Sequence, residues 1–145
     1  MSEVYKTTRR VEFRDTDAAG IVHFSAFFAY MEEVEHEFLR QLGLSVIMRD
    51  EHGEFSWPRV SVHCEYKGAV RFEDILDIEV RVLRRGEKSI TYGFEFMHAM
   101  RPIASGKIIA VCCRLDPMYP PRSIPIPDWI AAKLPNPPAA ETEAH

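Results

Sequence analysis

Four segments in the second half of the chain are rich in strand-forming residues, and they constrain the fold more than any other feature. They span residues 59–66, 76–85, 89–96 and 107–115. In the first three, apolar and polar residues alternate with the period of two that is typical of a sheet with unlike faces. The fourth is apolar at nearly every position, which is typical of a central strand covered on both faces. The links between the segments are short, so we predict antiparallel neighbours.

The first half of the chain predicts one strand and one long helix. Residues 4–14 are rich in strand formers and lead into a glycine-containing bend, DTDAAG, at residues 15–20. The apolar residues that follow recur every three or four positions, as on one face of a helix that ends at Gly43. They are Phe24, Phe27, Phe28, Met31, Val34, Phe38, Leu39 and Leu42. The four aromatic residues predict deep burial against the sheet, and residues 49–56 are expected to be irregular.

These segments predict an α+β protein, with five antiparallel strands and one long helix in a single domain over residues 1–134. Residues 129–134 are expected to form a short last helix, and the proline-containing residues 135–145 a disordered tail. One helix cannot cover both faces of a five-stranded sheet. We therefore expect a second copy of the chain to cover the leftover apolar face, in a homodimer or a larger homo-oligomer.

Composition argues against several classes of protein. The net charge is -4 and the basic residues are scattered among acidic ones, so we expect no nucleic-acid partner. We also expect no membrane association and a cytoplasmic location, because the chain shows no secretory signal, no membrane-spanning apolar run and no disulfide framework among its three cysteines. The histidines and cysteines, including His63 and Cys64, lack the spacing of zinc ligands, so we expect no metal site.

The bend at residues 15–20 is the candidate site, because it places Asp15 and Asp17 just before the start of a helix. Backbone N–H groups and the positive end of the helix dipole lie at such a place. Two aspartates in a loop are, by themselves, more typical of a turn than of catalysis. The surrounding motif adds information: Phe13, Asp15, Asp17, Gly20, Ile21 and Val22 are followed by His23 and Phe24.

With this motif, the sequence resembles the hotdog-fold acyl-CoA thioesterases of the 4-hydroxybenzoyl-CoA thioesterase type. The resemblance covers roughly residues 4–130 and implies a five-stranded antiparallel sheet wrapped around the long helix. It also implies dimers or tetramers with active sites between subunits. The implied activity is hydrolysis of an acyl-CoA thioester to a free acid and CoA, without a cofactor, because CoA is part of the substrate.

The resemblance also assigns roles within the bend. Asp17 is the implied catalytic carboxylate, and the sequence leaves open whether it attacks as a nucleophile or activates water as a general base. Free N–H groups near His23 and Phe24 would stabilise the thioester oxygen as it becomes negative. For Asp15 we expect a structural role in bonding N–H groups of the bend. Many relatives carry Tyr-His at the positions of His23 and Phe24, and the aryl-specific type carries two Phe. This chain has His followed by Phe and matches neither pattern, so the role of His23 stays open.

Other residues are candidates for substrate binding. Arg85, Lys88 and Ser89 occupy the place of a basic hairpin that would bind the phosphates of CoA in the family. Trp57 either lines the acyl pocket or packs in the core. Glu35 lies inside the apolar helix face, where it either pairs with an arginine of a neighbouring strand or acts as a helper acid.

Three further alternatives remain at this point. Phe24 favours an aromatic acyl group, but Phe27, Phe28 and Trp57 suit a fatty acyl chain as well. The carrier is either CoA or acyl carrier protein. Besides a thioesterase, the same fold could serve as a non-catalytic acyl-CoA binding or sensing module, or as a dehydratase acting on a hydroxyacyl thioester.

Overall fold

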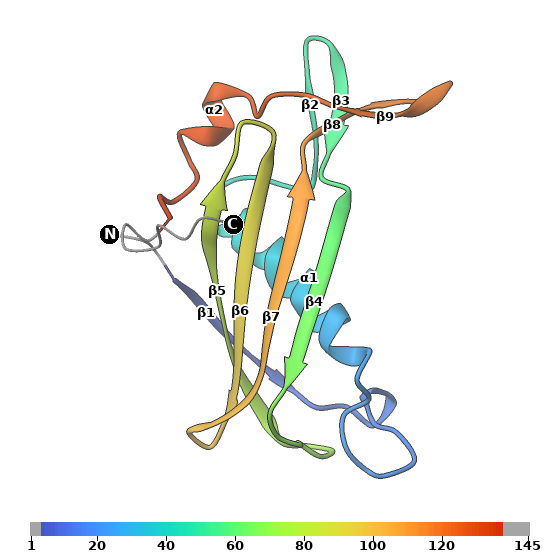
Figure 1. Ribbon diagram of the computed structural model, residues 1–145, viewed down its shortest axis with the longest axis vertical. Helices are drawn as coiled ribbons and strands as arrows, with labels where there is room; N and C mark the ends of the chain where they lie inside the picture. Colours follow the sequence, from blue (N-terminus) through green and yellow to red (C-terminus); the bar gives the residue numbers. More distant parts are fainter. Residues whose placement is uncertain (1–3, 138–145) are drawn as a thin grey trace.

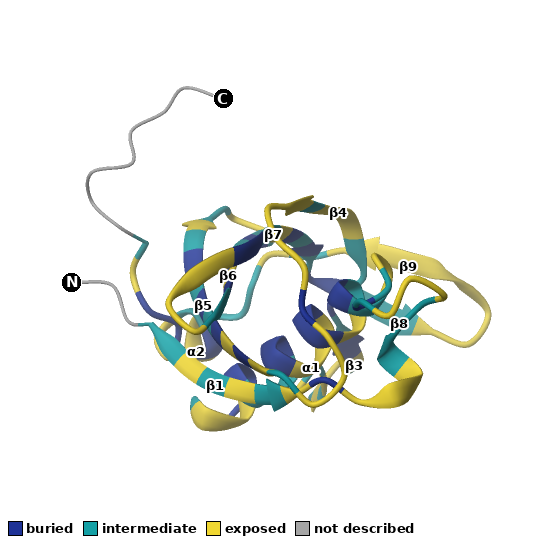
Figure 2. Cartoon of the chain, turned by 90° about the horizontal axis from the view of Figure 1, so that it is seen from below, coloured by how far each residue is buried: buried dark blue, intermediate teal, exposed yellow. Residues whose placement is uncertain are grey.

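The computed structural model describes residues 4–137, and its centre is an antiparallel sheet packed on one long helix (Figure 1). The strands, in spatial order, are β1 (Tyr5–Arg10), β5 (Ile75–Arg85), β6 (Ser89–His98), β7 (Arg101–Val111) and β4 (Arg59–Tyr66). Each neighbouring pair is antiparallel. Figure 2 shows these strands curving around helix α1 (Ala26–Gln41). The predicted α+β architecture, a five-stranded sheet around one long helix, is confirmed.

The alternation seen in the sequence determines which side chains face the helix. The buried residues of β5 and β6 are Leu76, Ile78, Val80, Val82, Ile90, Tyr92, Phe94 and Phe96, and they pack with Phe27, Met31, Val34, Phe38 and Leu39 of α1. Gly106 of β7 lies directly against Met31 of α1. A Cβ at this glycine would lie 2.3 Å from the Met31 sulfur, so a larger residue would displace the Met31 side chain.

Helix α1 ends as the sequence predicts. Gly43 has a φ of +79°, a conformation that favours glycine. The Leu44 N–H donates to the Leu39 carbonyl at 2.8 Å and the Gly43 N–H donates to the Arg40 carbonyl at 3.0 Å. This is the Schellman arrangement, which satisfies carbonyl groups that the helix end would otherwise leave unpaired.

The expected burial of four aromatic residues on the helix face is only partly correct. Phe27 and Phe38 are buried, but Phe28 is half-buried and Phe24 is 61% exposed. Phe24 lies in the turn before α1, so its side chain does not follow the helical face. Tyr30 and Glu35 are buried on α1 in addition to the apolar residues.

The prediction that residues 49–56 are irregular was wrong. They contribute to a hairpin of β2 (Ile47–Asp50) and β3 (Gly53–Ser56), which continues through β8 (Cys113–Asp116) and β9 (Tyr119–Ser123) into a second, four-stranded sheet. Arg114 of β8 stabilises the hairpin, because its guanidinium bonds both carboxylate oxygens of Asp50 at 2.8 and 3.2 Å and lies over the Phe55 ring. The strand predicted over residues 107–115 is also divided in two. It belongs to β7 up to Val111 and to β8 from Cys113, and these strands lie in different sheets.

The outer face of the five-stranded sheet mixes charged and apolar residues, whereas we expected a leftover apolar face. Glu79, Arg81, Glu95 and Lys107 line a shallow hollow there together with Leu83. Exposed apolar side chains lie instead on the edge strand β4, where Val60 is 62% and Val62 43% exposed.

The last described element is the short helix α2 (Asp128–Ala131), within the expected residues 129–134 except for its first residue. Of the predicted tail, residues 138–145 lie outside the described residues. No helix between residues 4 and 137 is both long and apolar enough to cross a membrane.

Candidate active site

The DTDAAG bend lies between β1 and α1 and folds back on itself. It follows a single 3₁₀ turn, η1 (Phe13–Asp15). The Asp17 N–H donates to the Ile21 carbonyl and the Gly20 N–H donates to the Asp17 carbonyl, both at 2.9 Å, and Gly20 has a φ of +82°. The Val22 N–H donates to the Val70 carbonyl at 2.9 Å, so the connection from β4 to β5 lies beside the bend.

The Asp17 side chain is held by one of its two oxygens. Its Oδ1 accepts the N–H groups of Ala19 at 2.8 Å and of Ile21 at 3.4 Å. Its Oδ2 makes no hydrogen bond within residues 4–137, and the residue is half-buried. The arrangement orients the carboxylate and leaves one oxygen available for a reaction.

Asp15 has a structural role, but a different one from that expected: its carboxylate bonds groups outside the bend, and the N–H of Ala19 inside the bend is bonded by Asp17 instead. Its Oδ2 accepts the Glu12 N–H at 2.9 Å and the Tyr30 hydroxyl at 2.9 Å. Its backbone carbonyl accepts the His23 N–H at 2.7 Å. Asp15 therefore joins the residues before the bend, the residues after it and helix α1.

The start of α1 offers a backbone donor at Phe24. The His23 N–H is already bonded to Asp15, whereas the Phe24 N–H has no acceptor in the part of the chain that the structure describes. The Tyr66 hydroxyl donates at 2.8 Å to the Phe24 carbonyl, which belongs to the next peptide group, and so restrains the backbone just after this donor. Partial burial and the neighbouring Cys64 raise the pKa of Tyr66 to about 12, so the hydroxyl keeps its proton at neutral pH.

His23 bonds to its own turn rather than to Asp17. Its Nδ1 lies 2.8 Å from the Ser25 hydroxyl and accepts the Ser25 N–H at 3.1 Å. Its ring stacks on Phe24, with ring centres 4.5 Å apart. Two more exposed aromatic residues, Phe13 and Phe72, contact each other edge to face at 6.0 Å. Phe72 follows Arg71, which pairs with Ile21 directly after the bend.

The basic hairpin lies far from the bend within one chain. Arg85, Lys88 and Ser89 surround the turn between β5 and β6, at the opposite end of β5 from Ile75 and the bend (Figure 1). Strands of this length span roughly 30 Å. The Arg85 guanidinium donates to the Ala131 carbonyl at 2.8 Å and to Asn136 at 3.2 Å, so it also holds the C-terminal segment. Lys88 is exposed.

Trp57 and Glu35 are core residues. Trp57 is 1% exposed, which agrees with the packing alternative. Glu35 forms an ion pair with Arg59 of β4, as one of the two sequence alternatives predicted. No three potential metal ligands among His, Cys, Asp and Glu come together in residues 4–137.

Sequence reasoning missed Tyr30 and Tyr66, the two hydroxyl donors that orient the bend and the helix start. Tyr30 lies on the same helix face as Phe27 and Met31. A buried tyrosine needs a partner for its hydroxyl, so its position was a usable signal. The partner itself depends on the tertiary fold.

Comparison with known proteins identifies the family. A family model described as the thioesterase-like superfamily matches residues 11–134. The chain belongs to this superfamily. It is 27% identical over 131 residues to a 1,4-dihydroxy-2-naphthoyl-CoA hydrolase of Synechococcus elongatus, with 87% of this chain and 94% of that protein covered. The resemblance found in the sequence is therefore confirmed.

Solved structures agree with the fold and with the enzyme class. The structure of BH1999 gentisyl-coenzyme A thioesterase superposes with a TM-score of 0.74 at 28% identity, covering 90% of this chain and 98% of that one. The 4-hydroxybenzoyl CoA thioesterase of Pseudomonas sp. strain CBS-3 superposes with a TM-score of 0.78 at 19% identity, with the same coverage. This chain has the hotdog thioesterase fold, and the predicted class, a thioester hydrolase, is that of its named relatives.

Proposed function

We propose that the protein is an acyl-CoA thioesterase that hydrolyses an aryl- or fatty-acyl-CoA thioester to a free acid and CoA. One observation carries the proposal. Among the described residues, one carboxylate oxygen of Asp17 and the Phe24 N–H at the start of α1 have no hydrogen-bond partner. The hydrogen bond from the His23 N–H to the Asp15 carbonyl joins the bend to this helix start. Hydrolysis of a thioester needs the two unpartnered groups, one to attack or to activate water and one to stabilise the oxyanion.

The reaction follows one of two routes through Asp17. As a general base, Asp17 takes a proton from water while the water oxygen bonds to the thioester carbon. As a nucleophile, it bonds to that carbon itself, and water then cleaves the mixed anhydride. In both routes the carbon–sulfur bond breaks and the CoA thiolate leaves and takes up a proton. The N-terminal end of α1, through the Phe24 N–H, stabilises the negative oxygen.

An aromatic acyl group is the favoured substrate class. Two relatives are named for aromatic substrates, dihydroxynaphthoyl-CoA and gentisyl-CoA. Phe13, Phe24 and Phe72 expose aromatic rings next to or within the bend region, and such rings pack well on a flat acyl group. His23 stacks on Phe24 and would border the same acyl group rather than take its protons.

The distance between the bend and the proposed CoA-binding residues supports a homodimer, or a homotetramer built from dimers. The basic residues Arg85, Lys88 and Ser89 lie roughly 30 Å from the bend in one chain, so one site can use both only if two copies contribute to it. The edge strand β4 supports the same arrangement. It exposes unpaired backbone groups and the apolar residues Val60 and Val62, as strands that pair with another chain do.

The proposed reaction requires no cofactor, because water and the thioester are its only reactants. The three cysteines are free thiols. Free thiols and a CoA substrate favour the cytoplasm.

The test measures thiol release from benzoyl-, hydroxybenzoyl-, short-chain and long-chain acyl-CoA by the wild type and by Asp17→Asn. We expect turnover that is fastest on an aromatic thioester and falls by about 10³-fold in the variant, since general acid–base groups contribute 10²- to 10⁴-fold. Binding of the CoA thioester, measured by calorimetry, should persist in the variant. Binding without any turnover by the wild type would identify an acyl-CoA binding module instead.

A further inference from the structure

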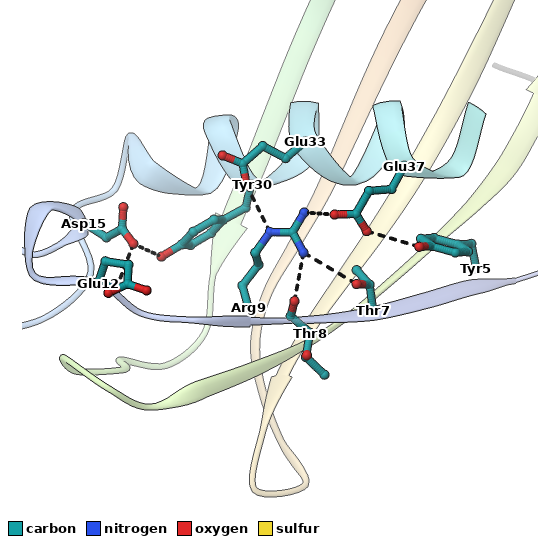
Figure 3. Close-up of polar contacts among 9 residues, drawn as sticks. All are labelled: Tyr5, Thr7, Thr8, Arg9, Glu12, Asp15, Tyr30, Glu33 and Glu37. Carbon is teal, nitrogen blue, oxygen red and sulfur yellow. Dashed lines mark hydrogen bonds and ion pairs between the residues drawn. The ribbon is translucent and has the colours of Figure 1, made fainter. Parts of the chain in front are cut away.

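The hydroxyl of Tyr30 connects helix α1 to the bend through a buried hydrogen bond. Tyr30 is 4% exposed and donates to Asp15 Oδ2 at 2.9 Å, as Figure 3 shows. Burial, and then the hydrogen bond to Asp15, raise the pKa of Tyr30, so its hydroxyl stays a donor throughout the working pH range. Within residues 4–137, it is the only side chain of α1 that hydrogen-bonds to residues 12–23.

The accepting residue, Asp15, is the point where the two ends of the bend meet. One carboxylate oxygen receives both the Tyr30 hydroxyl and the Glu12 N–H, and the Asp15 carbonyl receives the His23 N–H. A shift of Asp15 would therefore move residues on both sides of Asp17. The hydrogen bonds of the Asp17 carboxylate, in contrast, stay inside the bend, at Ala19 and Ile21.

A second set of contacts holds the rest of α1 on β1. Arg9 bonds Glu33 at 3.0 Å and also bonds Glu37, which accepts the Tyr5 hydroxyl at 3.1 Å (Figure 3). These contacts do not include a residue of the bend. Loss of the Tyr30 hydroxyl should therefore leave α1 in place on the sheet and release mainly the bend.

We propose that Tyr30 is a positioning residue, which holds Asp17 at a fixed place relative to the Phe24 N–H by clamping Asp15 to α1. This inference rests on the proposed function, because it assumes that Asp17 and the Phe24 N–H act on one thioester. Small displacements of reacting groups can cost up to about 10²-fold in rate. The effect of losing the clamp should thus appear in kcat rather than in substrate binding.

The experiment compares Tyr30→Phe with the matched control Tyr5→Phe. Each variant removes one tyrosine hydroxyl that donates to a carboxylate. The Tyr30 hydroxyl donates to Asp15 of the bend, whereas the Tyr5 hydroxyl donates to Glu37 of α1. We expect kcat of Tyr30→Phe to fall about 10- to 100-fold with KM within about 2-fold of the wild type, and Tyr5→Phe to keep kcat within about 2-fold. Equal kcat values for the two variants, or a loss only in KM, would overturn the proposal.

A double variant tests whether Tyr30 acts through Asp15. Asp15→Ala removes the acceptor oxygen, and if the two residues act as a unit, Tyr30→Phe/Asp15→Ala should be about as slow as the slower single variant. Multiplied losses would show that Tyr30 acts by another route and would overturn the proposal.

Hydrogen exchange separates this inference from the proposed function. The Ala19 and His23 amides both donate to residues of the bend, so both should exchange at least about 5-fold faster in Tyr30→Phe and at wild-type rates in Tyr5→Phe. If the wild type hydrolyses no thioester, the proposed function fails, while faster exchange still supports the clamp. Unchanged exchange in Tyr30→Phe refutes the clamp even in an active enzyme.

Discussion

Glu35 of α1 and Arg59 of β4 form an ion pair in which the carboxylate is completely buried. Glu35 Oε1 pairs with the Arg59 guanidinium, whereas Oε2 has no hydrogen-bond partner among the described residues. Burial raises the pKa of Glu35, and the charge of Arg59 opposes this rise. A buried carboxylate of this kind is tolerated only while its partner remains.

Removal of Arg59 should therefore be strongly destabilising. We expect Arg59→Met to lower the free energy of unfolding by about 3 kcal/mol at pH 7, because it leaves an uncompensated buried charge. The double variant Glu35→Leu/Arg59→Met should lie within about 1 kcal/mol of the wild type or be more stable. Urea unfolding measures both.

The matched control for this experiment is Arg49→Met. Arg49 also pairs with a glutamate, Glu54, but at 3.4 Å and with both side chains largely exposed. Such pairs contribute about 0–1 kcal/mol. If Arg59→Met cost no more than Arg49→Met, the buried pair would not have the role assigned to it.

The pairing of strands could be predicted from the sequence where it depends on neighbours in the chain. Alternation over residues 76–96 was sufficient to predict the β5–β6 hairpin and its buried face. It was not sufficient for β3, whose partner β8 lies about sixty residues later and is tied to the hairpin by Arg114 and Asp50. Contacts of this kind leave no periodic signal.

The residues of the candidate site, too, could be predicted only where they lie close together in the sequence. Asp15, Asp17 and Gly20 lie within six residues, so their motif could be recognised. The hydroxyl donors Tyr30 and Tyr66 reach the bend and the helix start from other elements, and only the fold brings them there. The contact of Arg85 with Ala131 could not be predicted either, because it joins residues 46 positions apart in the sequence.

Acid should weaken the contact of α1 with β1. Burial opposes ionisation of Glu37, but hydrogen bonds and charge from Arg9 bring the pKa of Glu37 below its usual 4.5. The stabilisation is thus fully present above pH 4.5 and is lost as the pH falls through the lower folded-state pKa. We expect Glu37→Gln to melt about 3 °C below the wild type at pH 7, with the gap closing below pH 4.

Calorimetry over this pH range provides the measurement, and Glu33→Gln provides the control. Glu33 bonds the same arginine, but its side chain is 52% exposed, so its loss should change the melting temperature little at any pH. A gap for Glu37→Gln that stays constant from pH 7 to pH 3 would contradict the assigned role of Arg9.

Lys88 should contribute to binding of the CoA nucleotide. We expect Lys88→Met to raise KM for a CoA thioester about 3-fold at low salt without a change in kcat, since one exposed charge contributes about 0.5–1 kcal/mol. The KM of a pantetheine thioester, which lacks the nucleotide, should not change. Lys107→Met, on the outer sheet face, is the control. Equal effects on the two substrates would show that Lys88 does not contact the nucleotide.

The edge strand β4 should hold two copies together, because the other edge is protected and this one is not. The β1 edge carries Lys6 and Arg10, exposed charges that discourage pairing, whereas β4 exposes Val60 and Val62. We expect Val62→Lys to convert the protein to monomers in light-scattering chromatography and to reduce thioesterase activity at least about 10-fold, since the proposed site would lose the hairpin of a second copy. Thr8→Lys, on the β1 edge, should leave both unchanged. A fully active monomer would show that one chain completes the site alone, and an unchanged oligomer would place its interface away from β4.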